Sequence, residues 1–457
     1  MKIIILGAGQ VGSSTARSMV AEGNDVTVVD TDPQLLNRLQ DSLDLRTVTG
    51  HASSPEVLVA AGAEDADMLI AVTANDEVNM VACQIASCLF KTPKKLARIR
   101  ASAYVEQANL FQPDVIPIDV IISPEQLVTQ YLQHLIQQPE VTEVHEFFKG
   151  KAQLVAVKID KKSPMAGQPI HHLLQILPKI SMRVAAIFRN NKVITAQGKV
   201  ELAANDEIFF LAETKHIAKL VEVFRPAYKP YERVIIAGGG HIGKQLAKLI
   251  ENSYKVKVIE HDDLQARSLA EELHNSIILN GDVADSSLLL EENIAKTDVF
   301  CAVTNDDEAN ILSAMLAKRL GARKTFSIIG KASHVGLVTE SAIDIAVSPA
   351  QVTIGTLLTQ IRRGDVVTVH SLKNGAAEAI EVIAHGDIKT SQVVGRHIEQ
   401  LKLPESANVA ALLRDEEILF PEKSLVIEPN DHLILFISEQ KDVAVVEKLF
   451  QVDFNYL

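Results

Sequence analysis

Tryptophan is absent from this 457-residue sequence, and aromatic residues make up only 4% of it. Aromatic rings form the stacking surfaces on which proteins bind single-stranded nucleic acid. Basic residues are also in the minority, because 45 Lys and Arg stand against 58 Asp and Glu, for a formal net charge of −13. A negative field repels nucleic acid and anionic lipid. We therefore expect no nucleic-acid partner, and we expect any membrane location to depend on another protein.

Long apolar runs and cysteines are scarce as well. No run approaches the roughly 18 apolar residues of a membrane-spanning helix, and the N-terminus enters a strand and a glycine turn at once, without the cleavage region of a signal peptide. Cys83, Cys88 and Cys301 lie in apolar segments without metal-ligand spacing, which predicts three buried thiols in a reducing cytoplasm. The adjacent His171 and His172 also lack a neighbouring metal ligand, so we expect them at the surface.

The sequence does contain a long internal repeat. An offset of 231 residues relates marker residues in the first part of each copy, and an offset of 225 relates those farther along. The pairs are Gly7 and Gly238, Gly50 and Gly281, Thr73 and Thr304, Asn79 and Asn310, then Ser123 and Ser348, Arg189 and Arg414, and Asp206 and Asp431. A period of this length is too long for a solenoid. It indicates two copies of a whole domain pair.

The first part of each copy alternates apolar strands with helices. Near-continuous apolar runs such as Ile3–Leu6 are typical of strands buried on both faces of a sheet, and Ser54-Pro55 and Asn75 or Asp76 suit helix starts. The strands expected in the first copy are Lys2–Leu6, Val26–Asp30, Leu45–Thr49, Met68–Thr73, Leu96–Arg100 and Val115–Ile118. The pattern predicts an α/β fold with a Rossmann-like, doubly wound parallel sheet in each copy.

The second part of each copy has short strands separated by Pro, Gly and Asn-Asp turns, which predicts a small α+β module. The strands expected there are Leu154–Ile159, Val184–Arg189, Glu207–Leu211, Ala379–Ile383, Val409–Arg414 and His432–Ile437. A helix with an apolar stripe joins the two parts. The stripe can dock on its own domain or on a partner subunit, and we favour subunit association. The predicted divisions are 1–122, nucleotide-binding; 123–142, connecting helix; 143–227, small module; then 228–347, 348–366 and 367–457 in the same order.

A G-x-G-x-x-G motif follows the first strand of each copy, at Gly7–Gly12 and at Gly238–Gly243. In such motifs the first glycine permits the tight turn, the second lets the backbone approach a pyrophosphate, and the third lets the helix pack closely on the strand. The phosphates then lie on free N–H groups at the positive end of the helix. Because the motif occurs twice in the same context, we predict two dinucleotide sites.

Further polar residues fall at the carboxyl ends of the predicted strands. Asp30 and Glu260 end the second strand of each sheet, where a carboxylate accepts hydrogen bonds from the adenosine ribose and repels the 2′-phosphate of NADP. Thr73 and Thr304 follow the fourth strand and are candidates for contacts with ribose or adenine. Arg98, on the fifth strand, is placed to reach the pyrophosphate. An offset of 231 gives Ile329 in its place in the second copy, so we expect the two sites to differ.

A nicotinamide dehydrogenase needs a substrate domain and a positioned acid or base beside the ring. The small modules offer few candidate catalytic groups, and two nucleotide domains each followed by a module suit a ligand-driven conformational device better. We therefore predict a binding protein and not an enzyme. An NAD-dependent oxidoreductase remains an alternative.

The two glycine motifs, the two acids, the Gly50 and Gly281 turns and the tandem order of domains resemble the RCK (regulator of potassium conductance) family, over nearly the whole chain. The resemblance implies a cytoplasmic NAD- or NADH-binding regulatory subunit, assembled into a homo-oligomeric ring of two or four chains. The ring would lie on the inner face of the cell membrane, held by a potassium-translocating integral membrane subunit of the TrkH or TrkG type. ATP or ADP is a possible ligand, especially at the second site. A regulator of a potassium efflux system, such as a glutathione-gated one, remains an alternative within what the resemblance implies.

The resemblance also names the residues expected to contact nucleotide. In the first copy they are Gly7, Ala8, Gly9, Gln10, Val11, Gly12, Asp30, Thr73, Ala74 and Arg98. In the second copy they are Gly238, Gly239, Gly240, His241, Ile242, Gly243, Glu260 and Thr304.

Overall fold

The computed structural model describes residues 1–190, 192–194, 196, 198–226, 229–331, 334, 343–362, 365–422 and 424–451. Ala227 and Tyr228, on either side of a predicted domain boundary, lie outside the described residues. The chain divides into two compact units. One unit is formed by residues 1–130, 235–251 and 256–354, and the other by 131–234, 252–255 and 355–457. Each unit therefore combines the corresponding parts of both sequence copies.

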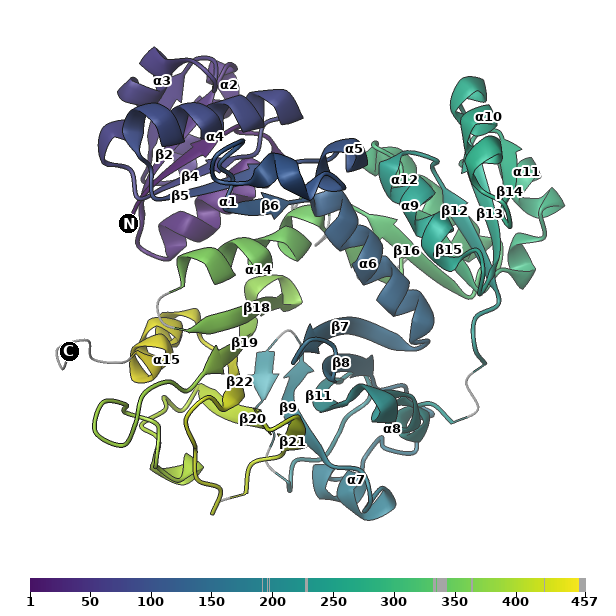
Figure 1. The fold of residues 1–457 in the computed structure, drawn as a ribbon. Coiled ribbons are helices and arrows are strands. Elements are labelled where there is room, and N and C mark those ends of the chain that lie inside the picture. The colour runs from purple at the N-terminus through teal and green to yellow at the C-terminus, as the bar shows by residue number, and fades with distance from the viewer. Residues whose placement is uncertain are drawn as a thin grey trace. The chain divides into compact units, whose positions relative to one another are not determined.

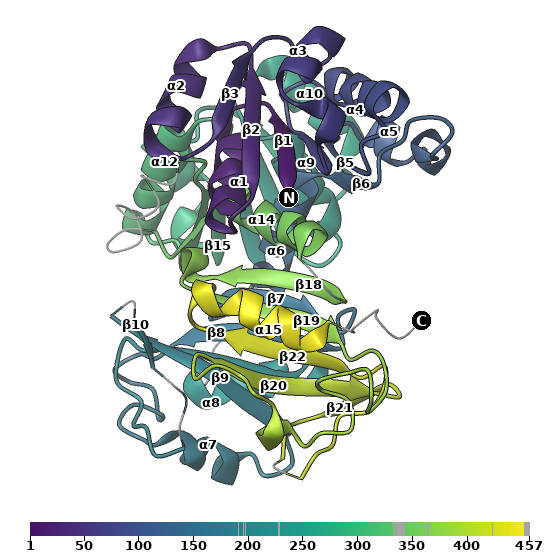
Figure 2. The same cartoon turned by 90° about the vertical axis from the view of Figure 1, so that its left-hand side faces the viewer.

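The first copy supplies a six-stranded sheet with the order β3-β2-β1-β4-β5-β6. Helices α1 and α2 cover one face, and α3 and α4 cover the other (Figures 1 and 2). Its elements are β1 (Lys2–Leu6), α1 (Gln10–Ala21), β2 (Asp25–Asp30), α2 (Pro33–Ser42), β3 (Arg46–Thr49), α3 (Pro55–Ala60), β4 (Met68–Ala71), α4 (Asp76–Phe90), β5 (Lys94–Arg98), α5 (Ser102–Val105) and β6 (Val120–Ile122). Each pair of neighbouring strands in this sheet is parallel. This is the doubly wound order that the apolar strand pattern predicts.

The second copy repeats this sheet in the order β14-β13-β12-β15-β16-β17. Its elements are β12 (Arg233–Ala237), α9 (His241–Ile250), β13 (Lys255–Glu260), α10 (Asp263–Glu272), β14 (Ile277–Asn280), α11 (Ser286–Glu291), β15 (Val299–Ala302), α12 (Asp307–Arg319), β16 (Lys324–Ile328) and β17 (Ile345–Val347). A helix follows each sheet, α6 (Pro124–Gln137) in the first copy and α14 (Pro349–Ile361) in the second. The predicted fold class is confirmed.

The other unit contains two five-stranded sheets, ordered β10-β9-β11-β8-β7 and β18-β19-β22-β20-β21, with antiparallel pairing between neighbours (Figure 2). The first has β7 (Val141–Phe147), β8 (Ala152–Lys158), α7 (Ile170–Ile176), β9 (Met182–Arg189), β10 (Lys192–Ile194), β11 (Glu207–Glu213) and α8 (Ile217–Phe224). The second has β18 (Val366–Leu372), β19 (Ala377–Ile383), β20 (Ala407–Arg414), β21 (Glu417–Leu419), β22 (His432–Ile437) and α15 (Val443–Phe450).

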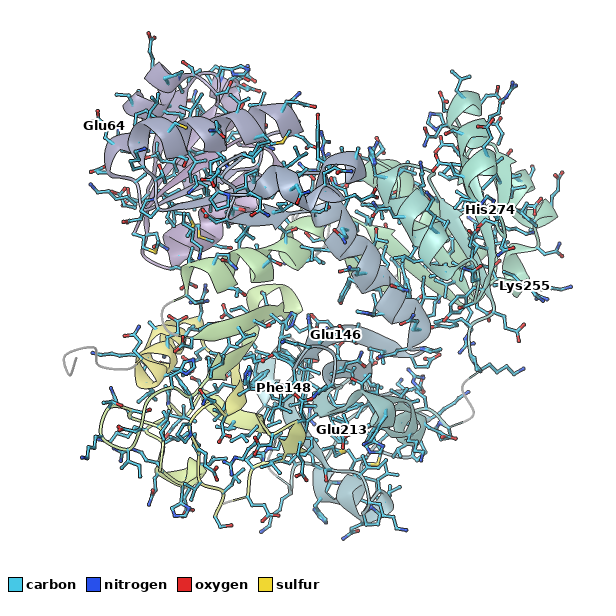
Figure 3. The ribbon with its side chains drawn as sticks, in the orientation of Figure 1. Glu64, Glu146, Phe148, Glu213, Lys255 and His274 are labelled. Atoms are coloured by element: carbon cyan, nitrogen blue, oxygen red, sulfur yellow. The ribbon has the colours of Figure 1, made fainter. Side chains whose placement is uncertain are left out.

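These two antiparallel sheets share one apolar core, in which Phe147 and Phe209 pack with Phe436. Phe148, labelled in Figure 3, lies just after β7. Its N–H donates to the Glu381 carboxylate of the other sheet at 3.0 Å. His145 and His370, which occupy the same place in the two copies, meet with ring centroids 4.7 Å apart. Burial, followed by the charge of His145, lowers the pKa of His370 to about 3. The two small modules are therefore packed against each other through equivalent surfaces.

The sixth strand of the first sheet was predicted at Val115–Ile118, and this prediction is wrong. The strand is β6, and its pairing with β5 begins only at Val120. Asp119 fixes this register, because its N–H donates to the Lys95 carbonyl at 2.8 Å and its carboxylate accepts from the Lys95 N–H at 2.6 Å. Pro117 interrupts the earlier apolar run, since proline has no N–H to donate to a ladder.

Two other expectations need correction. The apolar stripes of α6 and α14 are covered by the chain itself: Val128, Leu132 and Leu357 are each no more than 1% exposed. The stripes are therefore not free surfaces for subunit association. Cys83 and Cys301 are buried as predicted, and burial raises the pKa of Cys83 to about 12. Cys88 is instead exposed, because it faces away from the sheet on α4.

The turn after β1 depends on close contact between two glycines. Gly7 has φ of +105°, a conformation that favours glycine. A Cβ on Gly12 would lie inside contact distance of the Gly7 carbonyl oxygen, whereas a Cβ on Gly9 would meet nothing within 4 Å. Gly238, Gly243 and Gly240 repeat these three conditions in the second sheet. The third glycine is thus required for packing, and the second leaves open space in front of the turn.

One buried amide joins the carboxyl ends of β4 and β5. The Asn79 side-chain oxygen accepts from the Thr73 N–H and hydroxyl at 3.0 and 2.7 Å, and its amide group donates to the Arg98 carbonyl at 2.9 Å. In the second sheet Asn310 makes the same bonds to Thr304 and, at 3.1 Å, to the Ile328 carbonyl. The counterpart of Arg98 is therefore Ile328. Ile329 was predicted, and it is wrong by one residue because the segment from Asn310 to the end of β16 is one residue shorter than the segment from Asn79 to the end of β5.

Gly12→Ala should destabilise the first sheet, because the new methyl group would push α1 away from the Gly7 carbonyl. Overpacking of this kind costs about 1–3 kcal/mol. Urea denaturation followed by circular dichroism measures the effect. Gly9→Ala is the matched control and should leave the unfolding midpoint unchanged. Equal midpoints for the two variants would contradict the packing argument.

Asn79→Ala should lower the free energy of unfolding of the first sheet by about 2–3 kcal/mol, because it leaves buried backbone groups without partners. Asn310→Ala should have a similar effect on the second sheet. Limited proteolysis with mass spectrometry distinguishes which sheet opens. Exposed Gln126→Ala should change neither protease pattern, and a loss of protection in the wrong sheet would count against the assigned role.

Candidate nucleotide site

A cavity of about 610 Å³ lies at the carboxyl edge of the first parallel sheet, where open α/β sheets bind ligands. This volume is in the usual range for cofactor sites. The residues predicted from the first copy that line it are Gly7, Gly9, Gln10, Val11, Asp30, Thr73, Ala74 and Arg98. The other two, Ala8 and Gly12, shape the turn behind this surface. The sequence-based candidates of the first copy therefore converge on one place.

The N-terminus of α1 opens into this cavity without a side-chain cap. Its N-cap is Gly9, which has no side-chain acceptor for the first helical N–H groups. Helices α2 and α4 begin instead with Asp32 and Asn75, whose side chains accept from backbone N–H groups. Unpaired N–H groups at a helix start attract anions. The same contrast holds in the second copy, where Gly240 precedes α9 without a side-chain bond.

Asp30 stands at the end of β2 and braces the glycine turn. Its carboxylate accepts from the Ala8 N–H at 2.6 Å and from the Asp32 N–H at 2.9 Å. In the second copy, Glu260 accepts from the Gly239 N–H at 2.7 Å and from the Asp262 N–H at 2.9 Å. Glu260 is 7% exposed. The carboxylates thus position the turns, and Asp30 also borders the cavity.

Thr73 and Ala74 form the rim beyond β4. The Thr73 hydroxyl donates to the Asn79 side chain, so its orientation is fixed by the amide that also holds Arg98. Asn75 then caps α4 by accepting from the Val78 N–H at 2.7 Å. Of the two candidates for this cap, Asn75 and Asp76, the structure selects Asn75. Asp76 instead accepts from the N–H groups of Arg100 and Ala101, at 2.9 Å each.

Arg98 does not extend freely into the cavity. Its guanidinium forms an ion pair with Glu125, on the first turn of α6, and the two side chains are only 17% and 16% exposed. Both residues line the cavity. Glu125 was not singled out from the sequence, although the neighbouring helix start at Ser123-Pro124 was. The only signal in the sequence is its place in the first turn, where carboxylates are common.

Residues of the second copy also line this cavity. Ile242 and Thr304, predicted for the second site, are among them, together with Asn305, Asp307, Ile328, Gly330 and Pro349. A Cβ on Gly330 would collide with the side-chain amide of Gln10, which shows how closely the two halves approach at this point. The remaining predicted residues of the second copy, Gly238, Gly239, Gly240, His241, Gly243 and Glu260, surround the equivalent turn of the second sheet.

The charges that line the cavity are mostly negative. Asp30, Glu125 and Asp307 supply carboxylates, and Arg98 supplies a guanidinium. His51 is exposed at the cavity wall, with its Nδ1 3.0 Å from the Ser53 hydroxyl. An anionic ligand would therefore be held mainly by backbone N–H groups and Arg98. A ligand with few negative charges suits this lining best.

Among the residues that the structure describes, no helix is both long and apolar enough to cross a membrane. Over the same residues, no group of three His, Cys, Asp or Glu side chains is arranged to hold a metal ion. His171 is exposed, as expected, and its Nδ1 lies 2.9 Å from the Gly198 carbonyl oxygen.

Two family models match the chain. The TrkA-N domain matches residues 3–124 and 234–349, and the TrkA-C domain matches residues 154–225 and 388–451. The Trk system potassium uptake protein TrkA of Halomonas elongata is 49% identical over 456 residues, with 100% of each chain covered. That of Vibrio alginolyticus is 50% identical over 452 residues, with 99% of each chain covered. These names refer to transport and not to a reaction, in agreement with the prediction that the chain is not an enzyme.

Solved structures support the fold. The GsuK RCK domain superposes with a TM-score of 0.62 at 16% identity, covering 98% of this chain and 94% of its own. The GsuK channel bound to NAD gives the same TM-score and identity, covering 98% of this chain and 78% of its own. The family matches span both copies and all four domains. The chain therefore belongs to the Trk system potassium uptake protein TrkA family, and it carries TrkA-N and TrkA-C domains in tandem, twice.

Proposed function

We propose that the chain is an NAD(H)-binding regulatory subunit of a membrane potassium uptake system, and that it acts by changing conformation when nucleotide binds. The observation that carries the proposal is the first cavity, which brings a glycine turn, the uncapped start of α1, Asp30 and Arg98 to one sheet edge. The relatives named for the Trk potassium uptake system align over their full length, which supports the same system for this chain.

The chemistry of the cavity favours a dinucleotide such as NAD or NADH. A pyrophosphate carries fewer negative charges than the triphosphate of ATP, and this lining offers one guanidinium among several carboxylates. Gly9 leaves room for the backbone to approach the phosphates. Asp30 can exchange its bond with the turn for the ribose hydroxyls, and its charge opposes the 2′-phosphate of NADP.

The second site would bind differently. Ile328 stands where the first copy has Arg98, so a phosphate there would depend on the start of α9 alone. We infer weaker binding of NAD(H) at the second turn. ATP or ADP is the alternative ligand for that turn, with Gly238–Gly243, Glu260 and Thr304 around it.

Regulation requires that each nucleotide prefer one conformation of the assembly. A tenfold preference at one site supplies about 1.4 kcal/mol, and several sites in a ring of two or four chains would add to a larger shift in a two-state gate. The partner we propose is a potassium-translocating integral membrane subunit of the TrkH or TrkG type. It would hold the protein at the inner face of the cell membrane.

Calorimetric titration of the full chain with NAD, NADH, ATP and NADP tests the nucleotide proposal. We expect roughly micromolar binding of NAD or NADH, weaker binding of NADP, and no loss of NADH absorbance on prolonged incubation. Gly9→Ala should abolish binding at the first site, because its methyl group would occupy the space in front of the turn. Asp30→Ala should weaken that site by about tenfold or more.

Exposed Asp41→Ala is the matched control for Asp30→Ala and should bind like the parent protein. Glu260→Ala should affect the second site alone. Absence of binding by all four nucleotides would overturn the proposal. Steady consumption of NADH would replace it with the oxidoreductase alternative.

A further inference from the structure

The ion pair between Arg98 and Glu125 occurs in one copy only. The first copy has Ser123-Pro124-Glu125 at the start of α6, and the second has Ser348-Pro349-Ala350 at the start of α14. Ile328 replaces Arg98, as the bonds from Asn79 and Asn310 show. Ile328 and Ala350 are both 6% exposed. The two copies therefore differ by a whole pair, charged in one and apolar in the other.

Electrostatics explains why both members of the Arg98–Glu125 pair are replaced together in the second copy. Removing one member of a poorly solvated ion pair leaves an uncompensated charge, which is strongly destabilising, whereas an apolar pair of suitable size is well tolerated. An apolar pair would therefore suffice if this place served folding alone, as the second copy demonstrates. The presence of a charged pair in the first copy therefore needs an explanation other than folding.

The pair is only partly satisfied in the structure. Arg98 donates through Nη2 to Glu125 Oε1, and the buried Arg98 Nε and Glu125 Oε2 have no hydrogen-bond partner. A guanidinium prefers two parallel bonds to a carboxylate or phosphate. Arg98 therefore retains unused donors at the cavity wall, where a phosphate could approach, and Glu125 holds it by a single bond.

We propose that Glu125 is a counter-ion that Arg98 exchanges for the pyrophosphate of a bound dinucleotide, which makes Glu125 a residue that sets the affinity of the first site and reports its occupancy. This inference rests on the proposed nucleotide function. When the pyrophosphate takes the guanidinium, Glu125 loses its partner and faces a like charge. The carboxylate must then turn away or shift with the first turn of α6. The second site, with Ile328 and Ala350, has no such exchange.

The coupling has a direction along the chain. Glu125 lies in the first turn of α6, the helix that continues to Gln137 and precedes β7. Pro124 and Ser123 fix the start of this helix, and the Ser123 hydroxyl accepts from the Gln126 N–H at 3.4 Å. A change in the position of the Glu125 carboxylate therefore acts on the first turn of α6 and not on a surface loop.

NADH titrations of the full chain test the exchange, with wild type, Glu125→Gln, Arg98→Gln and the double variant compared. Glu125→Gln should tighten the first site by about tenfold, because the competing carboxylate is gone. Arg98→Gln should weaken it. In the Arg98→Gln background the gain from Glu125→Gln should vanish, since Glu125 acts through Arg98. Glu56→Gln, which removes an exposed first-turn carboxylate of α3, is the matched control and should bind like wild type.

A further double variant keeps the test valid if the single variants misfold. Arg98→Ile with Glu125→Ala copies the pair of the second copy, so it should fold, and its first site should bind NADH more weakly than wild type. Hydrogen exchange provides a structural readout. NADH should speed amide exchange in the first turn of α6 in wild type and leave that turn unchanged in Glu125→Gln.

The outcomes separate the two proposals. NADH binding by wild type with unchanged or weaker binding by Glu125→Gln would overturn the exchange and leave the nucleotide function standing. A gain in affinity that persists without Arg98 would also overturn it. Absence of NADH binding by wild type would overturn the nucleotide proposal and this inference with it.

Discussion

Asn79 and Asn310 make the contacts on which the carboxyl edges of the two parallel sheets depend. Each amide is no more than 1% exposed and joins the ends of two adjacent strands. In the first copy, the same side chain orients the Thr73 hydroxyl and fixes the strand end that carries Arg98. A buried amide without hydrogen-bond partners lowers the free energy of unfolding. The strand ends at this edge are therefore held in the one arrangement that satisfies the amide. The cavity and the position of Arg98 at its wall follow from that arrangement.

The two copies share the contacts that shape the turn and the strand ends, but they differ in the side chains placed beside them. Both retain the close glycine contact, the acid that braces the turn and the amide between strands. They differ in the ion pair, which Ile328 and Ala350 replace in the second copy. The two copies thus share the contacts that shape the backbone and differ in charged side chains. This combination suits a protein whose two sites differ in ligand or affinity. Under the proposed function, a single tandem chain would respond to nucleotide at one site while the other keeps a different affinity.

Much of the fold was predictable because its causes are local. Gly7 needs a positive φ, Gly12 has no room for a side chain, and runs such as Ile3–Leu6 bury both strand faces. Errors arose where a local pattern had two solutions. The apolar residues from Val115 onward could have begun the last strand, but Asp119 pairs with Lys95 and moves it to β6. The counterpart of Arg98 was expected at Ile329 but is Ile328, because the segment between the buried asparagine and this strand end is one residue shorter in the second copy.

The sequence by itself determined the doubly wound parallel class of the two large sheets, the two glycine turns and the acids beside them, because each is set by neighbours in the chain or by a short βαβ unit. Only the tertiary structure decided that corresponding domains of the two copies combine within each unit. It also decided that His145 meets its own counterpart His370 and that Arg98 meets Glu125. These contacts join segments far apart in sequence or on separate elements, and their partners depend on the path of the whole chain, which residue spacing does not contain.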